Sequence, residues 1–133
     1  MKKKIINKII KVIKVKSKIL ELIRQANKQV KRFNPKRSEI IIGLELAGRY
    51  MAGAFNFLIK GILQREYKTR KGRENAMVKL IKITNDKDIS DLWSNVEYLK
   101  GFYYHDSSYL VIKRALRDSK TKLLLLIKKY KLQ

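Results

Sequence analysis

The sequence predicts an all-α protein, in which a long basic N-terminal helical arm precedes a four-helix-bundle-like body. Apolar residues recur at helical spacing over most of the 133 residues, and no segment shows the strict alternation of a half-buried strand. The breaks between the periodic segments are short, which favours antiparallel neighbouring helices. With 45% hydrophobic residues the chain can bury a core, so wholesale disorder is excluded.

The first segment is expected to be an amphipathic helix with one cationic face. Glu21 is the only acidic residue before Glu39, so like charges one turn apart repel each other without compensation. A solvated face on an ordinary bundle helix is the alternative, but the lack of interspersed carboxylates favours a face that binds an anion. At 100° per residue the lysines Lys3, Lys4, Lys8, Lys11, Lys14 and Lys18 gather on one side, and the other side carries Ile5, Ile6, Ile9, Val12, Ile13, Leu20 and Ile23.

The arm ends at the only proline. Pro35 cannot continue a helix, whereas Asn34 as N-cap and Pro35 at the first helical position can begin the next one. Residues 1–37 hold 14 basic residues and one acidic residue, a net charge of +13 out of +22. We therefore divide the chain into a basic arm, residues 1–37, and a helical body, residues 38–133.

The first body helix is expected from Pro35 to about Lys68. Ala47, Ala54 and Gly61 repeat every seven positions within it, so another helix can approach its backbone closely. Residues 68–73 are expected to form a basic loop, which either extends an anion-binding surface or is merely solvated. A short helix follows at about residues 74–84.

Two more helices follow a turn at residues 85–88. Asp88 or Ser90 can cap the first of them, which carries Trp93 and Leu99 among its apolar residues. The last helix is expected over about residues 108–131. Its expected buried residues are Leu110, Val111, Ala115, Leu116 and residues 123–127.

Composition excludes several classes of function. Without cysteine there is no disulfide scaffold, zinc finger, iron–sulfur site or thiol nucleophile. The one histidine, His105, excludes His-rich metal sites, and no apolar run is long enough for a transmembrane helix. The basic start has the charge of a secretory signal, but Lys8, Lys11 and Lys14 interrupt the apolar stretch, so we expect it to be mature structure.

No pattern of residues indicates catalysis, a cofactor or a metal. Asp86, Asp88 and Asp91 have part of the spacing of a calcium loop, but the required glycine and terminal glutamate are missing, so helix capping is the better interpretation. His105 has no upstream arginine at the spacing that a small helical RNase would need, and beside Asp106 it is expected to have a local structural role. The protein is therefore expected not to be an enzyme.

The charge indicates a polyanionic partner. A net charge of +22 opposes compaction unless it is neutralised, which points first to nucleic acid and then to an anionic membrane surface. Lysine outnumbers arginine 24 to 9, and lysine acts as a point charge on phosphates, so binding should be insensitive to sequence. The aromatic residues between Tyr98 and Tyr109 are interpreted as core or subunit contacts, which favours duplex over single-stranded nucleic acid.

The expected DNA contacts are basic residues of the arm and of the loop at residues 68–73. They would neutralise phosphates and release counterions. They are Lys3, Lys4, Lys8, Lys11, Lys14, Lys18, Arg24, Lys28, Lys31, Arg32, Lys36, Arg37, Arg70, Lys71 and Arg73.

The Lys-rich amphipathic N-terminal helix, the break at Asn34-Pro35 and the Ala- and Gly-rich helix between Gly43 and Gly61 resemble the major coat proteins of filamentous viruses of hyperthermophilic archaea, of the lipothrixvirus and rudivirus type. The resemblance covers the whole chain at the level of architecture and length. It implies that paired subunits, alone or with a second homologous coat subunit, assemble helically around linear double-stranded DNA. It also implies that the N-terminal helices wrap the duplex and hold it in A-form inside a virion.

Other functions stay open from the residues alone. A small helical nuclease or toxin-like domain would need His105 to act with an arginine. A nucleoid-associated DNA-binding protein would use the same cationic face. A membrane-surface protein would lay the arm in the interface, but no Trp or Phe precedes Phe33, so membrane contact is compatible with the sequence without being required.

Overall fold

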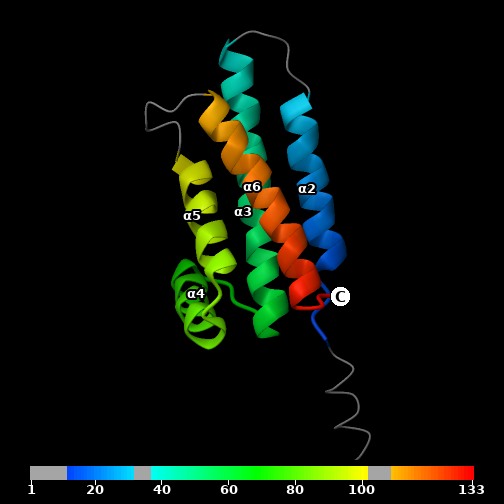
Figure 1. Ribbon diagram of the computed structural model, residues 1–133, viewed down its shortest axis with the longest axis vertical. Helices are drawn as coiled ribbons and strands as arrows, with labels where there is room; N and C mark the ends of the chain where they lie inside the picture. Colours follow the sequence, from blue (N-terminus) through cyan, green and yellow to red (C-terminus); the bar gives the residue numbers. More distant parts are fainter. Residues whose placement is uncertain (1–11, 32–36, 102–108) are drawn as a thin grey trace, which may run out of the picture.

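The protein is a bundle of helices (Figure 1). The computed structural model describes residues 12–31, 37–101 and 109–133, and for Lys31 and residues 37–41 it describes the backbone alone. These residues contain no strand, so the all-α prediction is confirmed. The helices are α2 (Lys16–Lys31), α3 (Arg37–Leu63), α4 (Arg70–Thr84), α5 (Lys87–Gly101) and α6 (Tyr109–Lys129).

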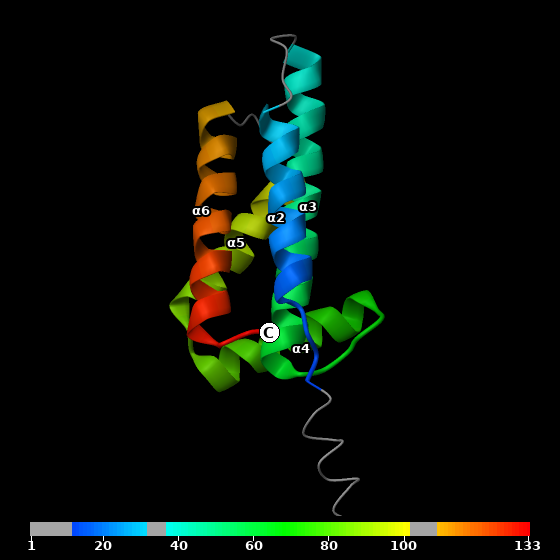
Figure 2. The same ribbon diagram turned by 90° about the vertical axis from the view of Figure 1, so that its right-hand side faces the viewer.

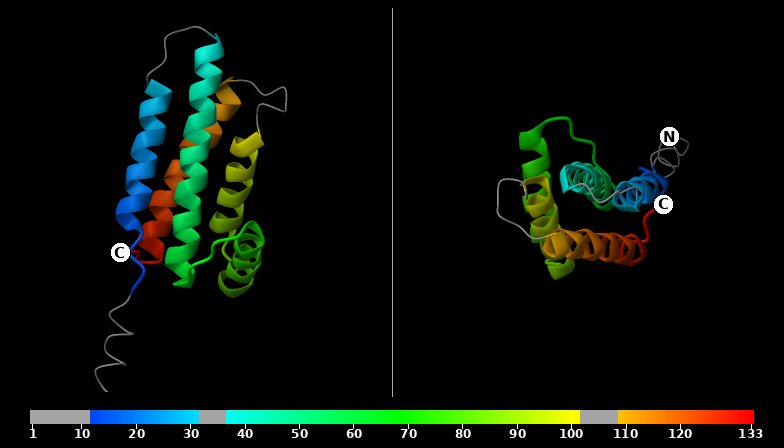
Figure 3. Two further views of the ribbon diagram at one scale, coloured as in Figure 1. Left: turned by 180° about the vertical axis from the view of Figure 1, so that it is seen from behind. Right: turned by 90° about the horizontal axis from the view of Figure 1, so that it is seen from above.

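Four of these helices run lengthwise and alternate in direction. They are α2, α3, α5 and α6, while α4 crosses the lower end and joins α3 to α5 (Figures 1 and 3). Helix α3 packs against all four of the other helices, whereas α2 and α6 barely meet. The arrangement therefore has α3 at its centre and an incompletely closed seam between α2 and α6.

Helix α2 belongs to the same hydrophobic core as the body helices. Val15, Ile19, Ile23 and Ala26 are buried, and their spacing of three or four residues makes one stripe that packs on α3. Ile23 is thus buried as predicted. Val12 and Leu20, which were expected on the apolar side, are each 39% exposed, because Leu20 falls outside this stripe and Val12 lies in the segment before the helix.

The predicted continuous arm helix is wrong over residues 12–15, which are not helical. Two sets of hydrogen bonds explain this. Gln64 accepts from the Ile13 N–H (2.7 Å) and donates to the Ile13 carbonyl (3.4 Å), while the Val15 and Lys16 N–H groups donate to the backbone oxygen of Gln133 (2.7 and 2.9 Å). Backbone groups bound in this way satisfy their hydrogen bonding outside a helix, so α2 begins only at Lys16.

Close approach to α3 at its small residues is confirmed. Ala47 and Ala54 are fully buried. A Cβ atom added at Gly48 would lie 2.8 Å from the backbone oxygen of Leu99 in α5, and one added at Gly61 would overlap the side chain of Val15. The packing of α5 and of the segment before α2 therefore depends on the absence of side chains at these positions.

Gly48→Ala is expected to lower the free energy of unfolding by about 1–3 kcal/mol, because the obstructing Leu99 oxygen belongs to backbone that moves only with α5. Gly53→Ala on the same helix is the matched control. Its Cβ would meet only the end of Leu22, at 3.4 Å, so the better helix propensity of alanine should stabilise the protein by up to about 1 kcal/mol. Urea denaturation measures both changes, and equal effects would contradict this account of the packing.

The beginnings of α4 and α5 differ from expectation. The predicted loop at residues 68–73 is wrong from Arg70 onward, because Thr69 caps α4: its hydroxyl accepts from the Gly72 N–H at 3.0 Å. Helix α5 is capped by Asp86, and not by Asp88 or Ser90, since the Asp88 N–H donates to an Asp86 carboxylate oxygen at 3.0 Å. Both caps start their helices earlier than periodicity indicated.

Helix α6 buries only part of its predicted set. Ala115, Leu116, Leu123, Leu126 and Ile127 are buried as expected, together with Ile112 and Ser119. The prediction is wrong for Leu110, which is 73% exposed, and for Val111, Leu124 and Leu125, which are exposed as well. A helix presents one stripe to its neighbours, and these four residues lie outside it.

Among the described helices, none has the length and apolar character needed to traverse a bilayer.

Candidate nucleic-acid interface

Seven of the fifteen predicted DNA contacts have side chains that the structure describes. Residues Lys3, Lys4, Lys8, Lys11, Arg32 and Lys36 lie outside the described residues, as does His105. Lys31 and Arg37 lie in helices, but only their backbone is described. Lys14, Lys18, Arg24, Lys28, Arg70, Lys71 and Arg73 can be placed.

The placed residues of the arm do not share one face. Lys14 precedes α2, and the Lys18 ammonium lies 5.1 Å from the centre of the Phe57 ring on α3. Arg24 donates two hydrogen bonds to Glu21, at 2.9 and 2.6 Å. These bonds, and one from Gln25, lower the pKa of Glu21 to about 2. Arg24 is therefore engaged within its own helix, whereas Lys14, Lys18 and Lys28 are exposed and have no described ion pair.

The positive charge of the body is largely uncompensated. Every carboxylate whose side chain is described lies within 4.0 Å of a lysine or arginine nitrogen. Most described lysines and arginines have no such partner, because basic residues outnumber acidic ones 33 to 11 in the chain. The surplus is therefore available to an external anion.

Three aspartates at the start of α5 form ion pairs with lysines along one edge of α6. Lys122 lies 3.0 Å from Asp88 and 3.7 Å from Asp91, and Lys129 lies 2.6 Å from Asp86. Asp86 also accepts a hydrogen bond from the Tyr130 hydroxyl at 2.7 Å. The three aspartates thus have lysine partners, and they fasten the start of α5 to the end of α6.

The opposite edge of α6 carries three cations, of which only Arg117 has an acidic neighbour, Asp118. Lys113, Arg117 and Lys120 follow one another at i, i+4 and i+7, so they form a single row facing α2. With Asn27 and Val30 of α2 they line a groove of about 200 Å³, at the seam where α2 and α6 barely meet (Figure 2). We call these five residues the α2–α6 groove.

No carboxylate lines the α2–α6 groove. The nearest candidate, Asp118, is adjacent in sequence to Arg117 and reaches its Nε only at 4.0 Å. The Lys113 ammonium lies over the Tyr109 ring at 5.1 Å, and Lys120 has no ion pair within the described part of the chain. An anionic oxygen entering here would meet three positive charges, of which only that of Arg117 has a carboxylate nearby.

Sequence reasoning missed this row of cations. The sequence contained the pattern, because basic residues at positions 113, 117 and 120 share one helical face and Asp118 does not fall into this spacing. The high charge density of residues 1–37 drew attention to the arm, and periodicity alone does not tell which edge of α6 faces another helix.

Arg70, Lys71 and Arg73 belong to a different part of the molecule. They lie in the first turn of α4, which has no acidic residue there, and Arg70 pairs with Glu74 at 3.4 Å. Arg70 and Arg73 line a cavity between α3, α4 and α5, on the side of the bundle away from α2 (Figure 1). The predicted basic residues are thus divided between two places.

No model of a known protein family, no curated protein and no solved structure matches the chain. Function has to be inferred from geometry and charge. The described surface has cations in a groove that no carboxylate lines, and the described carboxylates already form ion pairs elsewhere. This is chemistry for holding an anion.

Proposed function

We propose that the protein is a structural, sequence-independent DNA-binding protein that coats linear double-stranded DNA. The observation that carries the proposal is the α2–α6 groove, where Lys113, Arg117 and Lys120 stand together without a carboxylate. Lysine and arginine bind duplex DNA chiefly by neutralising phosphates, which needs no reading of bases. No cofactor is part of this function.

The composition of the groove favours a duplex over a single strand. Proteins that bind single strands combine basic grooves with aromatic side chains on which bases stack. The lining of the α2–α6 groove contains no aromatic residue, and its floor is formed by Met51 and Leu116. Phosphates on a paired backbone are the groups such a groove can bind.

Coating a long polymer also needs contacts between neighbouring copies. Leu110, Ile42 and Ile83 are 73, 58 and 64% exposed, and exposed apolar side chains of this size favour contact with another protein surface. We propose that copies of this chain, alone or with a second homologous coat subunit, pack side by side on the duplex. Together with the resemblance of the sequence to viral coat proteins, such packing supports the proposal of a capsid protein located in the virion.

The test is to mix the protein with linear double-stranded DNA and look for regular filaments by electron microscopy. The full chain is expected to form them. A chain of residues 12–133 is the matched comparison, because deleting residues 1–37 would also remove Ile19, Ile23 and Ala26 from the core.

The shortened chain should keep its helical circular dichroism and lose regular filaments, because it lacks Lys3, Lys4, Lys8 and Lys11. Failure of the full chain to bind the duplex would contradict the proposal. Equally regular filaments from residues 12–133 would contradict the role of the N-terminal lysines and leave the α2–α6 groove as the binding surface.

A further inference from the structure

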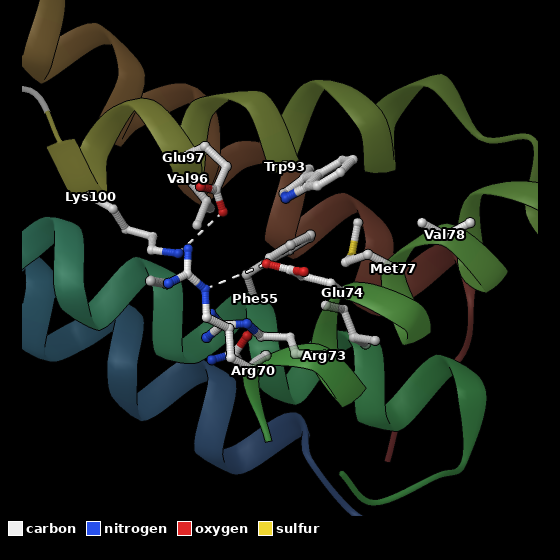
Figure 4. Close-up of a pocket in the computed structure, with 13 residues that line it drawn as sticks. Phe55, Arg70, Arg73, Glu74, Met77, Val78, Trp93, Val96, Glu97 and Lys100 are labelled. Carbon is white, nitrogen blue, oxygen red and sulfur yellow. Dashed lines mark hydrogen bonds and ion pairs between the residues drawn. The ribbon is translucent and has the colours of Figure 1, made fainter. Parts of the chain in front are cut away.

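A second concave site lies between α3, α4 and α5. It is a cavity of about 300 Å³, and its apolar wall includes Phe55, Met77, Trp93 and Val96 (Figure 4). Small-molecule sites are typically concave and mainly apolar with a few polar groups, and this volume is at the lower end of their range. The cavity can therefore hold only a small ligand.

The charged residues of this cavity gather at one end. Figure 4 shows Arg70, Arg73 and Lys100 at the end away from Val78 and Trp93. Arg70 pairs with Glu74 at 3.4 Å, and Lys100 pairs with Glu97 at 3.2 Å. Arg73 has no ion pair with a described carboxylate, so this end of the cavity carries one unmatched positive charge.

The two ion pairs do not prevent an anion from binding. All four of their side chains are at least one third exposed, and ion pairs in contact with water contribute little and rearrange easily. The start of α4 adds to the attraction. Its first turn carries Arg70, Lys71 and Arg73 and no acidic residue, although the dipole of a helix favours negative charge at that end.

We propose that this cavity binds a small aromatic anion. A flat ring system of one or two rings would lie against Trp93, Phe55 and Met77, and its single carboxylate, phosphate or sulfonate would bind Arg73. The site is separate from the α2–α6 groove, and this proposal does not depend on DNA binding.

Trp93 provides a direct readout, because it is the only tryptophan of the chain and lines the cavity. Adenosine monophosphate and naphthalene-2-sulfonate are the aromatic anions to titrate, and adenosine and inorganic phosphate are their separated halves. Either aromatic anion should change the Trp93 fluorescence saturably. Adenosine should bind at least about tenfold more weakly than the monophosphate, and inorganic phosphate should leave the fluorescence unchanged.

Arg73→Gln should weaken binding of the aromatic anion by about tenfold or more, because a hydrogen bond to a charged group is lost. The variant should stay folded and no less stable, since it removes a cation from a helix N-terminus. Lys82→Gln, on the same helix and outside the cavity, makes the same change of charge and should keep the affinity.

The absence of a saturable signal with both aromatic anions would overturn the proposal. Equal weakening by Arg73→Gln and Lys82→Gln would also overturn it, because the attraction would then be a property of the whole basic surface. Isothermal titration calorimetry gives the same affinities without relying on the fluorophore.

Discussion

The affinity of the protein for linear duplex DNA is expected to fall by about three to five decades between 50 and 200 mM salt. This is the response when roughly six to ten phosphates are neutralised per subunit, since each neutralised phosphate releases condensed counterions. Fluorescence anisotropy with a labelled duplex of random sequence measures the slope of log affinity against log salt concentration. A flat response would contradict phosphate neutralisation as the source of binding.

The α2–α6 groove should account for a defined share of that slope. Substitution of Lys113, Arg117 and Lys120 by glutamine removes three cations, so the slope should become less steep by about 2.7. The matched control substitutes three exposed lysines that lie outside the groove and have no described ion pairs, Lys79 and Lys82 of α4 and Lys87 of α5. An identical change in both variants would show that net charge, and not the groove, determines binding.

Asp86→Ala is expected to lower the free energy of unfolding by about 2–3 kcal/mol, measured by urea denaturation with circular dichroism. The buried Asp86 carboxylate accepts from the Asp88 N–H, from the Tyr130 hydroxyl and from the Lys129 ammonium. Its removal uncaps α5 and takes an acceptor from the partly buried Tyr130 hydroxyl and from the half-exposed Lys129 ammonium.

Asp118→Ala is the comparison, because its contact with Arg117 is exposed and spans 4.0 Å. That substitution should change stability by less than about 0.5 kcal/mol. Similar losses from the two aspartates would contradict the role given to Asp86.

The same carboxylate makes stability depend on acidity. Burial alone would raise the pKa of Asp86, but the bonds from Lys129, Tyr130 and the Asp88 backbone outweigh it and hold the pKa below its ordinary value. Its contribution is therefore complete above about pH 4 and is lost as the pH falls through the lower pKa of the folded state. Asp86→Asn has no carboxylate to titrate at this position. The difference in the free energy of unfolding between Asp86→Asn and the native protein should therefore become smaller below pH 4.

The sequence predicted the presence of the body helices α3 to α6, though not all of their bounds, because apolar spacing is local. The sequence also predicted close helix contacts at Ala47, Ala54 and Gly61, because a seven-residue repeat of small side chains has few other causes. The packing of α2 was not predictable in the same way. An amphipathic stripe such as Val15, Ile19 and Ile23 looks the same whether it covers its own chain or a neighbouring one.

The candidate site was harder to predict than the fold. The row of Lys113, Arg117 and Lys120 becomes a groove only because α2 lies across from it, and that neighbour comes from nearly a hundred residues earlier in the chain. Asp86, Asp88 and Asp91 were expected to cap a helix, and Asp86 does so. Their ion pairs with Lys122 and Lys129 could not be predicted, because these depend on how α6 packs against α5.

The hydrogen bonds from Val15 and Lys16 to Gln133 have a consequence for the order of folding. They join positions separated by almost the whole length of the chain, and such contacts form late because a large loop must close first. During synthesis α2 leaves the ribosome long before residue 133 exists. The bonds from Val15 and Lys16 can therefore form only after Gln133 has been made, whereas the bonds between Ile13 and Gln64 can form earlier.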